Sequence, residues 1–239
     1  MAACSSDFFK KWICKGDFLS ADDFLSLCRK QSWYRVPGCY IILVFRGKHQ
    51  ARNLSNYSKG YVGQSVDIYN RVRDHVSGRG NKSIYEEYAS GKTLLIQIVP
   101  SSEESLNDLE CKLIGSLDRS RLYNKTDGGS AVRCRDKSEF ILPDRRLLLP
   151  WTRGCGRMNR ITFQFPEKGT TKLKINGILI GKFRQGSKIS FDISDGEYRF
   201  KVSASGKKSF RKTRYISSRK EFLVSRGIIS TSVIAVRRK

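Results

Sequence analysis

The spacing of apolar residues changes near the middle of the chain, from patterns that combine strands and helices to patterns of short strands alone. Residues 39–45 (CYIILVF) are apolar on both alternating faces, which is typical of a central strand covered on both sides. Apolar residues then recur at helical spacing over residues 65–77. The same reasoning predicts further strands around 60–63 and over 93–99, and further helices over 83–89 and from residue 101.

The first 36 residues predict a helical extension ahead of this block. The segment SADDFLSLCRK offers Ser20 as an N-cap, followed by acidic residues in the first turn. Phe24, Leu25, Leu27 and Cys28 form its apolar stripe. We expect this stripe to serve packing and not chemistry.

From about residue 159 the chain consists of short alternating segments separated by turn residues. Asn176-Gly177 lies between two such segments and is the strongest hairpin signal in the sequence. Short strands with regularly spaced turns indicate a small all-β sandwich or barrel. We therefore predict an α+β protein in four parts: a helical extension over 1–36, a mixed domain over 37–134, a linker over 135–158 and a basic β-sandwich-like domain over 159–239.

The net charge of the chain indicates which class of partner the protein binds. Lys and Arg number 46 against 22 Asp and Glu, which leaves a formal charge of +24. Residues 151–239 hold 22 of the basic and 5 of the acidic side chains, so they contribute 22 − 5 = +17. Such an excess favours a polyanionic partner, and DNA or RNA is the natural candidate.

The cysteines and the hydropathy of the chain indicate the cellular compartment of the protein. The seven cysteines are scattered and form no CxxC pair, so they indicate reduced thiols and neither a disulfide framework nor a zinc site. No stretch approaches the roughly 20 apolar residues of a membrane span, and the first residues lack the apolar core of a signal peptide. We expect a cytoplasmic protein with no membrane partner.

Two helices carry charged residues in unusual places. On the helix over 65–77, Arg71 and His75 border the apolar face, where a cation either snorkels or faces a cleft. On the helix from residue 101, Glu110 falls inside a stripe of leucines. A buried unpaired carboxylate costs several kcal/mol, so Glu110 predicts a partner, either a metal ion or an arginine.

These features occur within an ordered series of short motifs. The series reads Gly38-Cys39-Tyr40, then Tyr61-Val62-Gly63, Arg71, His75, Glu110 and Asn124. In order and spacing it resembles the GIY-YIG nuclease superfamily over about residues 37–130. The sequence departs from that pattern in Cys39, which replaces an isoleucine, in a long insert before Tyr61, and in Asn81, which lies where some members have a second histidine.

The resemblance implies a small three-stranded antiparallel sheet flanked by helices, and metal-dependent endonuclease activity on DNA phosphodiester bonds. Arg71 would neutralise the phosphate, and Glu110 would hold one divalent ion, Mg²⁺ or Mn²⁺. Tyr40 or Tyr61 would act as general base or water positioner, with its pKa lowered by neighbouring cations, and His75 would share the proton transfer. Asn124 would orient Glu110 or the backbone. Gly38 and Gly63 would be structural.

Several alternatives stay open at the level of the sequence. A non-catalytic basic nucleic-acid-binding protein explains the charge but gives Glu110 no role. Within the superfamily, a restriction or defence role is preferred over homing, repair or toxin roles. An Asp…Glu-x-Lys nuclease is disfavoured because Glu110 and Lys112 would lie on different faces of a helix. A homodimer, RNA as substrate, and a protein partner for the C-terminal domain also remain possible.

Overall fold

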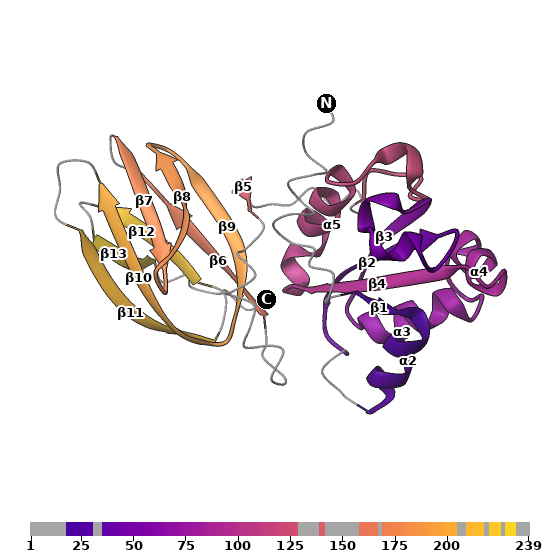
Figure 1. Cartoon of the computed structure of the whole chain (residues 1–239). Helices are drawn as coiled ribbons and strands as arrows, with labels where there is room; N and C mark the ends of the chain where they lie inside the picture. Colours follow the sequence, from indigo (N-terminus) through magenta and orange to yellow (C-terminus); the bar gives the residue numbers. More distant parts are fainter. Residues whose placement is uncertain are drawn as a thin grey trace. The chain divides into compact units, whose positions relative to one another are not determined.

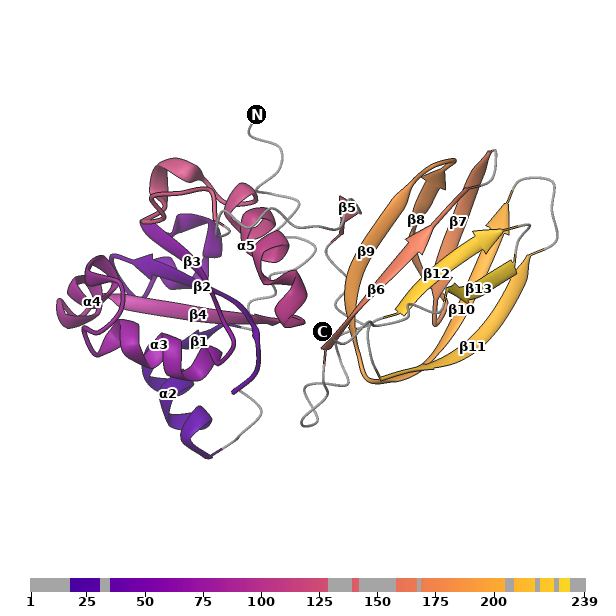
Figure 2. The ribbon, with the colours of Figure 1, turned by 180° about the vertical axis from the view of Figure 1, so that it is seen from behind.

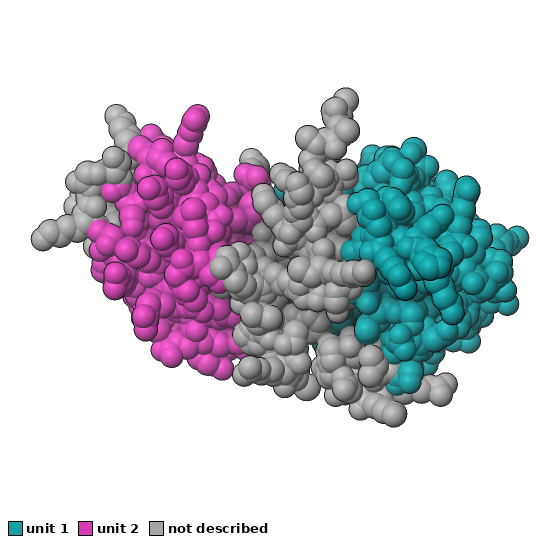
Figure 3. Space-filling model, viewed as in Figure 1, with its two compact units in different colours: residues 1–133 teal, residues 134–239 magenta. Residues whose placement is uncertain are grey.

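The computed structural model divides the chain into two compact units, Met1–Arg133 and Cys134–Lys239 (Figure 3). Each unit is described here by itself. The described residues are 18–30, 35–128, 139–141, 158–166, 169–204, 209–217, 220–225 and 228–232. The start of the predicted helical extension, most of the predicted linker, and the side chains of Leu27 and Cys28 lie outside them.

A four-stranded antiparallel sheet in the order β1-β4-β2-β3 forms the centre of the first unit. Its strands are β1 (Leu19–Ser20), β2 (Gly38–Phe45), β3 (Lys59–Ser65) and β4 (Thr93–Pro100). Every residue of β2 is buried, which confirms the prediction of a central strand covered on both sides. The expected sheet of three strands gains β1, an edge strand too short to leave a sequence pattern.

Helices cover both faces of this sheet (Figures 1 and 2). The described α-helices of the unit are α2 (Ala21–Lys30), α3 (Ile68–Val76), α4 (Lys82–Ala89) and α5 (Leu106–Gly115). Residues of α2 and α3 share a core with Tyr40, Ile42 and Val44 of β2. Cys39, the residue before Tyr40, points to the other face, where its thiol donates a hydrogen bond to the carbonyl oxygen of Leu106 in α5 at 3.5 Å. None of the helices in the described part of the chain is long and apolar enough to cross a lipid bilayer.

The predicted N-terminal helix belongs to the core of the first unit. Its Ser20 hydroxyl accepts a hydrogen bond from the backbone N–H of Asp23 at 3.1 Å, which confirms the N-cap. Phe24 is buried against the sheet, and Leu25 packs at the edge of the same core. The segment is therefore a structural part of the mixed domain.

The last helix of this unit begins later than the sequence pattern suggests. A short 3₁₀ turn, η5 (Glu103–Ser105), precedes α5, so the expected start at residue 101 is five residues too early. Leu106, Leu109, Leu113 and Ile114 are its buried residues. The apolar stripe of α5 thus packs on the face of the sheet opposite α2 and α3.

The second unit is a β-sandwich, which decides between the sandwich and the barrel that the sequence left open (Figure 1). Its two sheets have the orders β11-β10-β7-β8 and β13-β12-β6-β9-β5. The strands are β5 (Glu139–Phe140), β6 (Met158–Gln164), β7 (Thr170–Ile175), β8 (Ile178–Arg184), β9 (Lys188–Ser194), β10 (Gly196–Ala204), β11 (Phe210–Ile216), β12 (Lys220–Ser225) and β13 (Ile228–Ser232). Phe163 lies at the centre of the core, with its ring near those of Phe191, Phe200 and Phe222.

The hairpin between β7 and β8 is the one that the sequence predicts. Asn176 and Gly177 have φ angles of 49° and 84°, the left-handed conformation that a two-residue hairpin turn requires. Glu139–Phe140, inside the predicted linker, pairs with β9 as strand β5, and Phe140 is buried. Some of that segment is thus part of the sandwich.

The burial of Phe24 leads to a stability prediction. Phe24→Ala should destabilise the first unit by about 3–5 kcal/mol, because a buried aromatic ring leaves a cavity. Calorimetry of the whole chain would record a lower Tm for that unit. Val66→Ala is the control, since Val66 is 60% exposed and its loss should change the Tm little. An equal Tm for Phe24→Ala and wild type would contradict the assignment of this helix to the core.

Candidate active site

Three rings from three elements meet at one end of the sheet in the first unit. Tyr40 comes from β2, Tyr61 from β3 and His75 from α3. The ring centroids of His75 lie 5.6 Å from Tyr40 and 5.1 Å from Tyr61, and the two tyrosine rings are 6.3 Å apart. Tyr40 and His75 are fully buried, whereas Tyr61 is half-buried. The Tyr61 ring is therefore the member of the cluster with access to a substrate.

Two glycines provide the space for this cluster. Gly63 lies directly opposite Tyr40 in the strand register, and a Cβ there would lie 2.2 Å from the Tyr40 hydroxyl oxygen. A Cβ on Gly38 would lie 2.5 Å from the carbonyl oxygen of Val99. Both distances are below contact, so the two motif glycines are required by packing.

The tautomer of His75 follows from its two hydrogen bonds. The backbone N–H of Asn81 donates to Nδ1 at 2.7 Å, so Nδ1 carries no proton. The proton of the neutral ring is then on Nε2, which lies 2.7 Å from the Tyr40 hydroxyl oxygen. His75 therefore donates its hydrogen bond to Tyr40.

His75 is also neutral, contrary to the expectation of two cations on this helix. Burial lowers its pKa to about 4, and the nearby charge of Arg71 acts in the same direction. The sequence pattern places it at the border of the apolar face, but the ring is fully enclosed. The described part of the site thus has one cation on α3, Arg71, beside an uncharged imidazole.

Arg71 is exposed on α3 and acts on all three rings. Its charge and a hydrogen bond favour the phenolate of Tyr40, and its charge favours that of Tyr61. Arg71 therefore lies close to both phenols, and its guanidinium can be reached from solvent. This is the position that a phosphate-binding arginine requires.

The phenol pKa values differ from the sequence-based expectation. Burial raises the pKa of Tyr40 well above its ordinary value, and burial also raises that of Tyr61. Arg71 opposes both shifts but does not overcome them. In the protein alone, the pKa of neither tyrosine therefore falls below its ordinary value, although Arg71 acts in that direction.

Glu110 lies on α5 and is half-buried, not enclosed among leucines as the helical pattern predicts. The reason is that Leu109 and Leu113 form the buried stripe of α5, while Glu110 lies at its border next to β3. Its Oε2 accepts a hydrogen bond from the side-chain amide of Gln64 at 3.0 Å. The same amide donates to Oδ1 of Asn107 at 2.7 Å. The negative charge of Glu110 reaches both Tyr40 and Tyr61, whose pKa values it raises.

Asn124 binds the backbone of β3, one of the two roles that the sequence analysis gives it. Its side-chain oxygen accepts from the N–H of Val62 at 2.9 Å, and its side-chain nitrogen donates to the carbonyl oxygen of Val62 at 2.7 Å. Val62 lies between the motif residues Tyr61 and Gly63. Asn124 therefore fixes the position of the strand that carries them.

Comparison with known families agrees with this geometry. Residues 37–124 match the family model of the GIY-YIG catalytic domain. The first unit contains a GIY-YIG domain. This identification confirms the resemblance and the α+β fold class, and it shows that residues 37–124 form a domain of a nuclease superfamily, whose substrates are nucleic acids. No curated protein sequence matches the chain.

GIY-YIG nucleases generally depend on a divalent metal ion, and the residues of this GIY-YIG domain fit one. Among the described residues, no group of three or more His, Cys, Asp or Glu side chains could hold a metal alone. Mg²⁺ suits such a place, because it binds through one or two carboxylates and takes its other ligands from water and substrate phosphate. The half-buried carboxylate of Glu110 can serve as that single protein ligand.

The sequence analysis of the GIY-YIG domain missed three residues of the site, Gln64, Gly80 and Asn107, and it named Asn81 without giving it a role. Gly80 leaves room for His75, because a Cβ there would lie 2.4 Å from Nδ1. Asn81 caps α4 with its side chain, which accepts from the N–H of Ile84. Two sequence signals pointed to this place: the departure from the family pattern at Asn81, and the SGRGN segment (77–81), which indicates a loop but not its contact with the imidazole.

The tautomer of His75 can be tested directly. Nitrogen NMR should show His75 protonated on Nε2 alone from pH 8 down to about pH 5, because its pKa is lowered to about 4. The chain has two histidines, so a His49→Gln variant would assign the signal. A ring that gains its second proton near pH 6.5, or that carries its proton on Nδ1, would contradict the contact with Asn81.

Proposed function

We propose that this protein is an endonuclease that hydrolyses the phosphodiester bonds of DNA with the help of one divalent metal ion. The observation that carries the proposal is the grouping of Tyr40, Tyr61 and His75 beside the exposed guanidinium of Arg71, within charge range of Glu110. Anionic phosphodiesters repel hydroxide, so hydrolysis needs a cation for the phosphate and a group that takes a proton from water.

Arg71 is proposed to bind the scissile phosphate. A guanidinium stays charged at all relevant pH values and offers two parallel donors to two phosphate oxygens. Its exposure allows a strand of DNA to reach it, and its position beside Tyr61 brings the phosphate to the half-buried phenol.

The direction of the hydrogen bonds favours Tyr61 over Tyr40 as the group that accepts the proton. His75 donates to the Tyr40 oxygen, and the Tyr40 hydroxyl bonds to Tyr61, where it stabilises the phenolate. Each donor thus points toward Tyr61. His75 is a positioning residue in this scheme. Its one nitrogen with a lone pair, Nδ1, already accepts a hydrogen bond from Asn81, so it cannot take a proton from water.

Glu110 is proposed as the carboxylate that holds the metal ion, Mg²⁺ or Mn²⁺. A bound divalent ion would stabilise negative charge on the phosphate and lower the pKa of a bound water. The Gln64 amide donates a hydrogen bond to one oxygen of Glu110. This bond fixes the orientation of the carboxylate before any ligand binds.

A restriction or other defence role in the cytoplasm is our proposal for the biology, with homing, repair and toxin roles as alternatives. It is supported by the combination of one catalytic block with a basic second unit. The proposed roles of the parts follow the domains given above: a packing helix, the GIY-YIG domain, a linker and a basic sandwich. Cleavage of both DNA strands by one site would need two copies or two events, which is compatible with a homodimer.

Cleavage of supercoiled plasmid with Mg²⁺ tests the proposal. We expect Arg71→Ala and Glu110→Gln each to lower the rate by about 10²–10³, as for the loss of one group that stabilises transition-state charge. Removal of metal with a chelator should abolish nicking. Arg73→Ala and Glu103→Gln are the matched controls, because Arg73 lies on the same helix over the ring of Tyr69 and Glu103 is exposed in η5.

The same variants separate an enzyme from a binding protein. Glu110→Gln should bind plasmid at least as tightly as wild type, since a negative charge is removed while the cations remain. Equal nicking by wild type and both site variants, or no nicking by any of them, would contradict the proposed function and favour a non-catalytic basic protein.

Single hydroxyl deletions test which tyrosine accepts the proton. Tyr61→Phe should lower kcat by about 10²–10⁴, the usual contribution of a general base. Tyr40→Phe should cost less, because Tyr61 and Arg71 remain in place. A larger loss for Tyr40→Phe than for Tyr61→Phe would reverse the assignment.

A further inference from the structure

The outer face of the β11-β10-β7-β8 sheet in the second unit is strongly basic. Along β7 and β10 buried residues alternate with outward ones, and the inward side chains, such as Leu173 and Phe200, belong to the core. The outward side chains between them include Lys174, Arg199 and Lys201. The alternation of the strands thus gathers cations on one surface.

Three cations of this face, two of them named above and the third from β11, lie in a row across three strands. Lys174 of β7 is directly opposite Lys201 of β10, which is directly opposite Arg211 of β11. Directly opposed side chains of antiparallel strands lie about 5 Å apart, and like charges in such pairs destabilise a sheet. The row therefore costs stability in the isolated protein, and an anion on this face would remove that cost.

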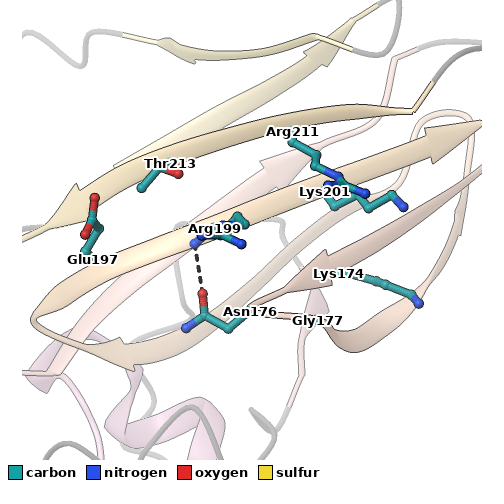
Figure 4. Close-up of a pocket in the computed structure, with 8 residues that line it drawn as sticks. All are labelled: Lys174, Asn176, Gly177, Glu197, Arg199, Lys201, Arg211 and Thr213. Carbon is teal, nitrogen blue, oxygen red and sulfur yellow. Dashed lines mark hydrogen bonds between the residues drawn. The ribbon is translucent and has the colours of Figure 1, made fainter.

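The described residues offer little negative charge to this surface. No ion pair between described residues joins Lys174, Lys201 or Arg211 to a carboxylate. Glu197 is the one acidic residue that lines the groove over the row, a hollow of about 630 Å³. Figure 4 shows Glu197 at the end of the groove away from Lys201 and Arg211.

A hydrogen bond between the β7–β8 turn and β10 fixes the part of the sheet that lines the groove. The Asn176 side chain at the hairpin turn accepts a hydrogen bond from the backbone N–H of Arg199 at 2.8 Å (Figure 4). This bond ties the β7–β8 turn to β10, so the cations project from a fixed surface and not from a loop. A surface that is rigid before binding loses less entropy when a ligand arrives.

We infer that this face binds the phosphate backbone of double-stranded DNA and supplies sequence-independent affinity to the protein. Outward residues recur about every 7 Å along a strand and about every 5 Å across strands, which gives a lattice of charges with no single anion pocket. A lattice of this kind suits a polymer with regularly repeated charge better than a discrete carboxylate. The choice of DNA rests on the proposed function of the first unit.

Salt dependence of binding by the full chain tests the inference. The probe is a short fluorescent DNA duplex of mixed sequence, titrated in a chelator so that no cleavage occurs. For Lys201→Gln/Arg211→Gln we expect the slope of log affinity against log salt to fall in magnitude by about 1.8, because two phosphate contacts are lost at about 0.9 each. Glutamines at these two outer positions should leave the Tm of the second unit unchanged or raise it, because they remove the repulsion between opposed like charges.

Lys220→Gln/Arg214→Gln is the matched control, with the same loss of one lysine and one arginine from the same unit. Arg214 lies opposite buried Tyr198 and so on the other side of β11, and Lys220 is on β12 in the second sheet. We expect the slope of this control to stay close to that of wild type. Equal slopes for both double variants would overturn the inference.

The result is separable from that of the proposed function. A slope that depends on Lys201 and Arg211, without any cleavage when Mg²⁺ is restored, would support this DNA-binding face and contradict the nuclease. Normal cleavage by wild type, together with an unchanged slope in Lys201→Gln/Arg211→Gln, would support the nuclease and contradict the DNA-binding face. In that case the face would belong to another polyanion, such as an acidic protein surface.

Discussion

The hydrogen bond from the backbone N–H of Asn81 to Nδ1 of His75 sets the polarity of the tyrosine cluster. Because that nitrogen must accept, the other must donate, and the Tyr40 oxygen receives its proton. The order of donors then runs from the turn after α3, through the imidazole and Tyr40, to the half-buried Tyr61. A ring that is buried, neutral and fixed at both nitrogens cannot rotate or titrate near pH 7, so the direction of this chain is built into the fold.

Strand β2 is the element through which the two faces of the first unit meet. It carries Tyr40 toward the core shared with α2 and α3, and Cys39 toward α5 on the opposite face. The edge strand β3, paired with β2, presents Tyr61 on one side and Gln64, the partner of Glu110, on the other. At this edge a cation from α3, Arg71, and a carboxylate from α5, Glu110, act on the same phenols.

Local patterns predicted those parts of the structure that depend on local physics. The apolar run of β2, the Ser20 cap and the Asn176-Gly177 turn each follow from neighbouring residues, and all three are confirmed. The state of His75 did not follow, because it is set by an N–H six residues away beyond the end of the helix. Helical spacing also predicted that Glu110 is more buried than it is. The spacing shows which residues share a face of α5 but not where strand β3 lies against that face. The raised phenol pKa values depend on burial by three elements that are distant in sequence, and no motif encodes them.

The two bonds of Asn124 have a consequence for self-association. A sheet edge exposes N–H and C=O groups that can recruit a strand from another chain, which is a common route to aggregation. At Val62 both groups are already taken by one side chain, and the neighbouring Gly60 is bridged to Leu122. The edge beside Tyr40 and Tyr61 is thus closed to strand addition at Val62, and pairing of two copies by extending the β3 edge there is blocked.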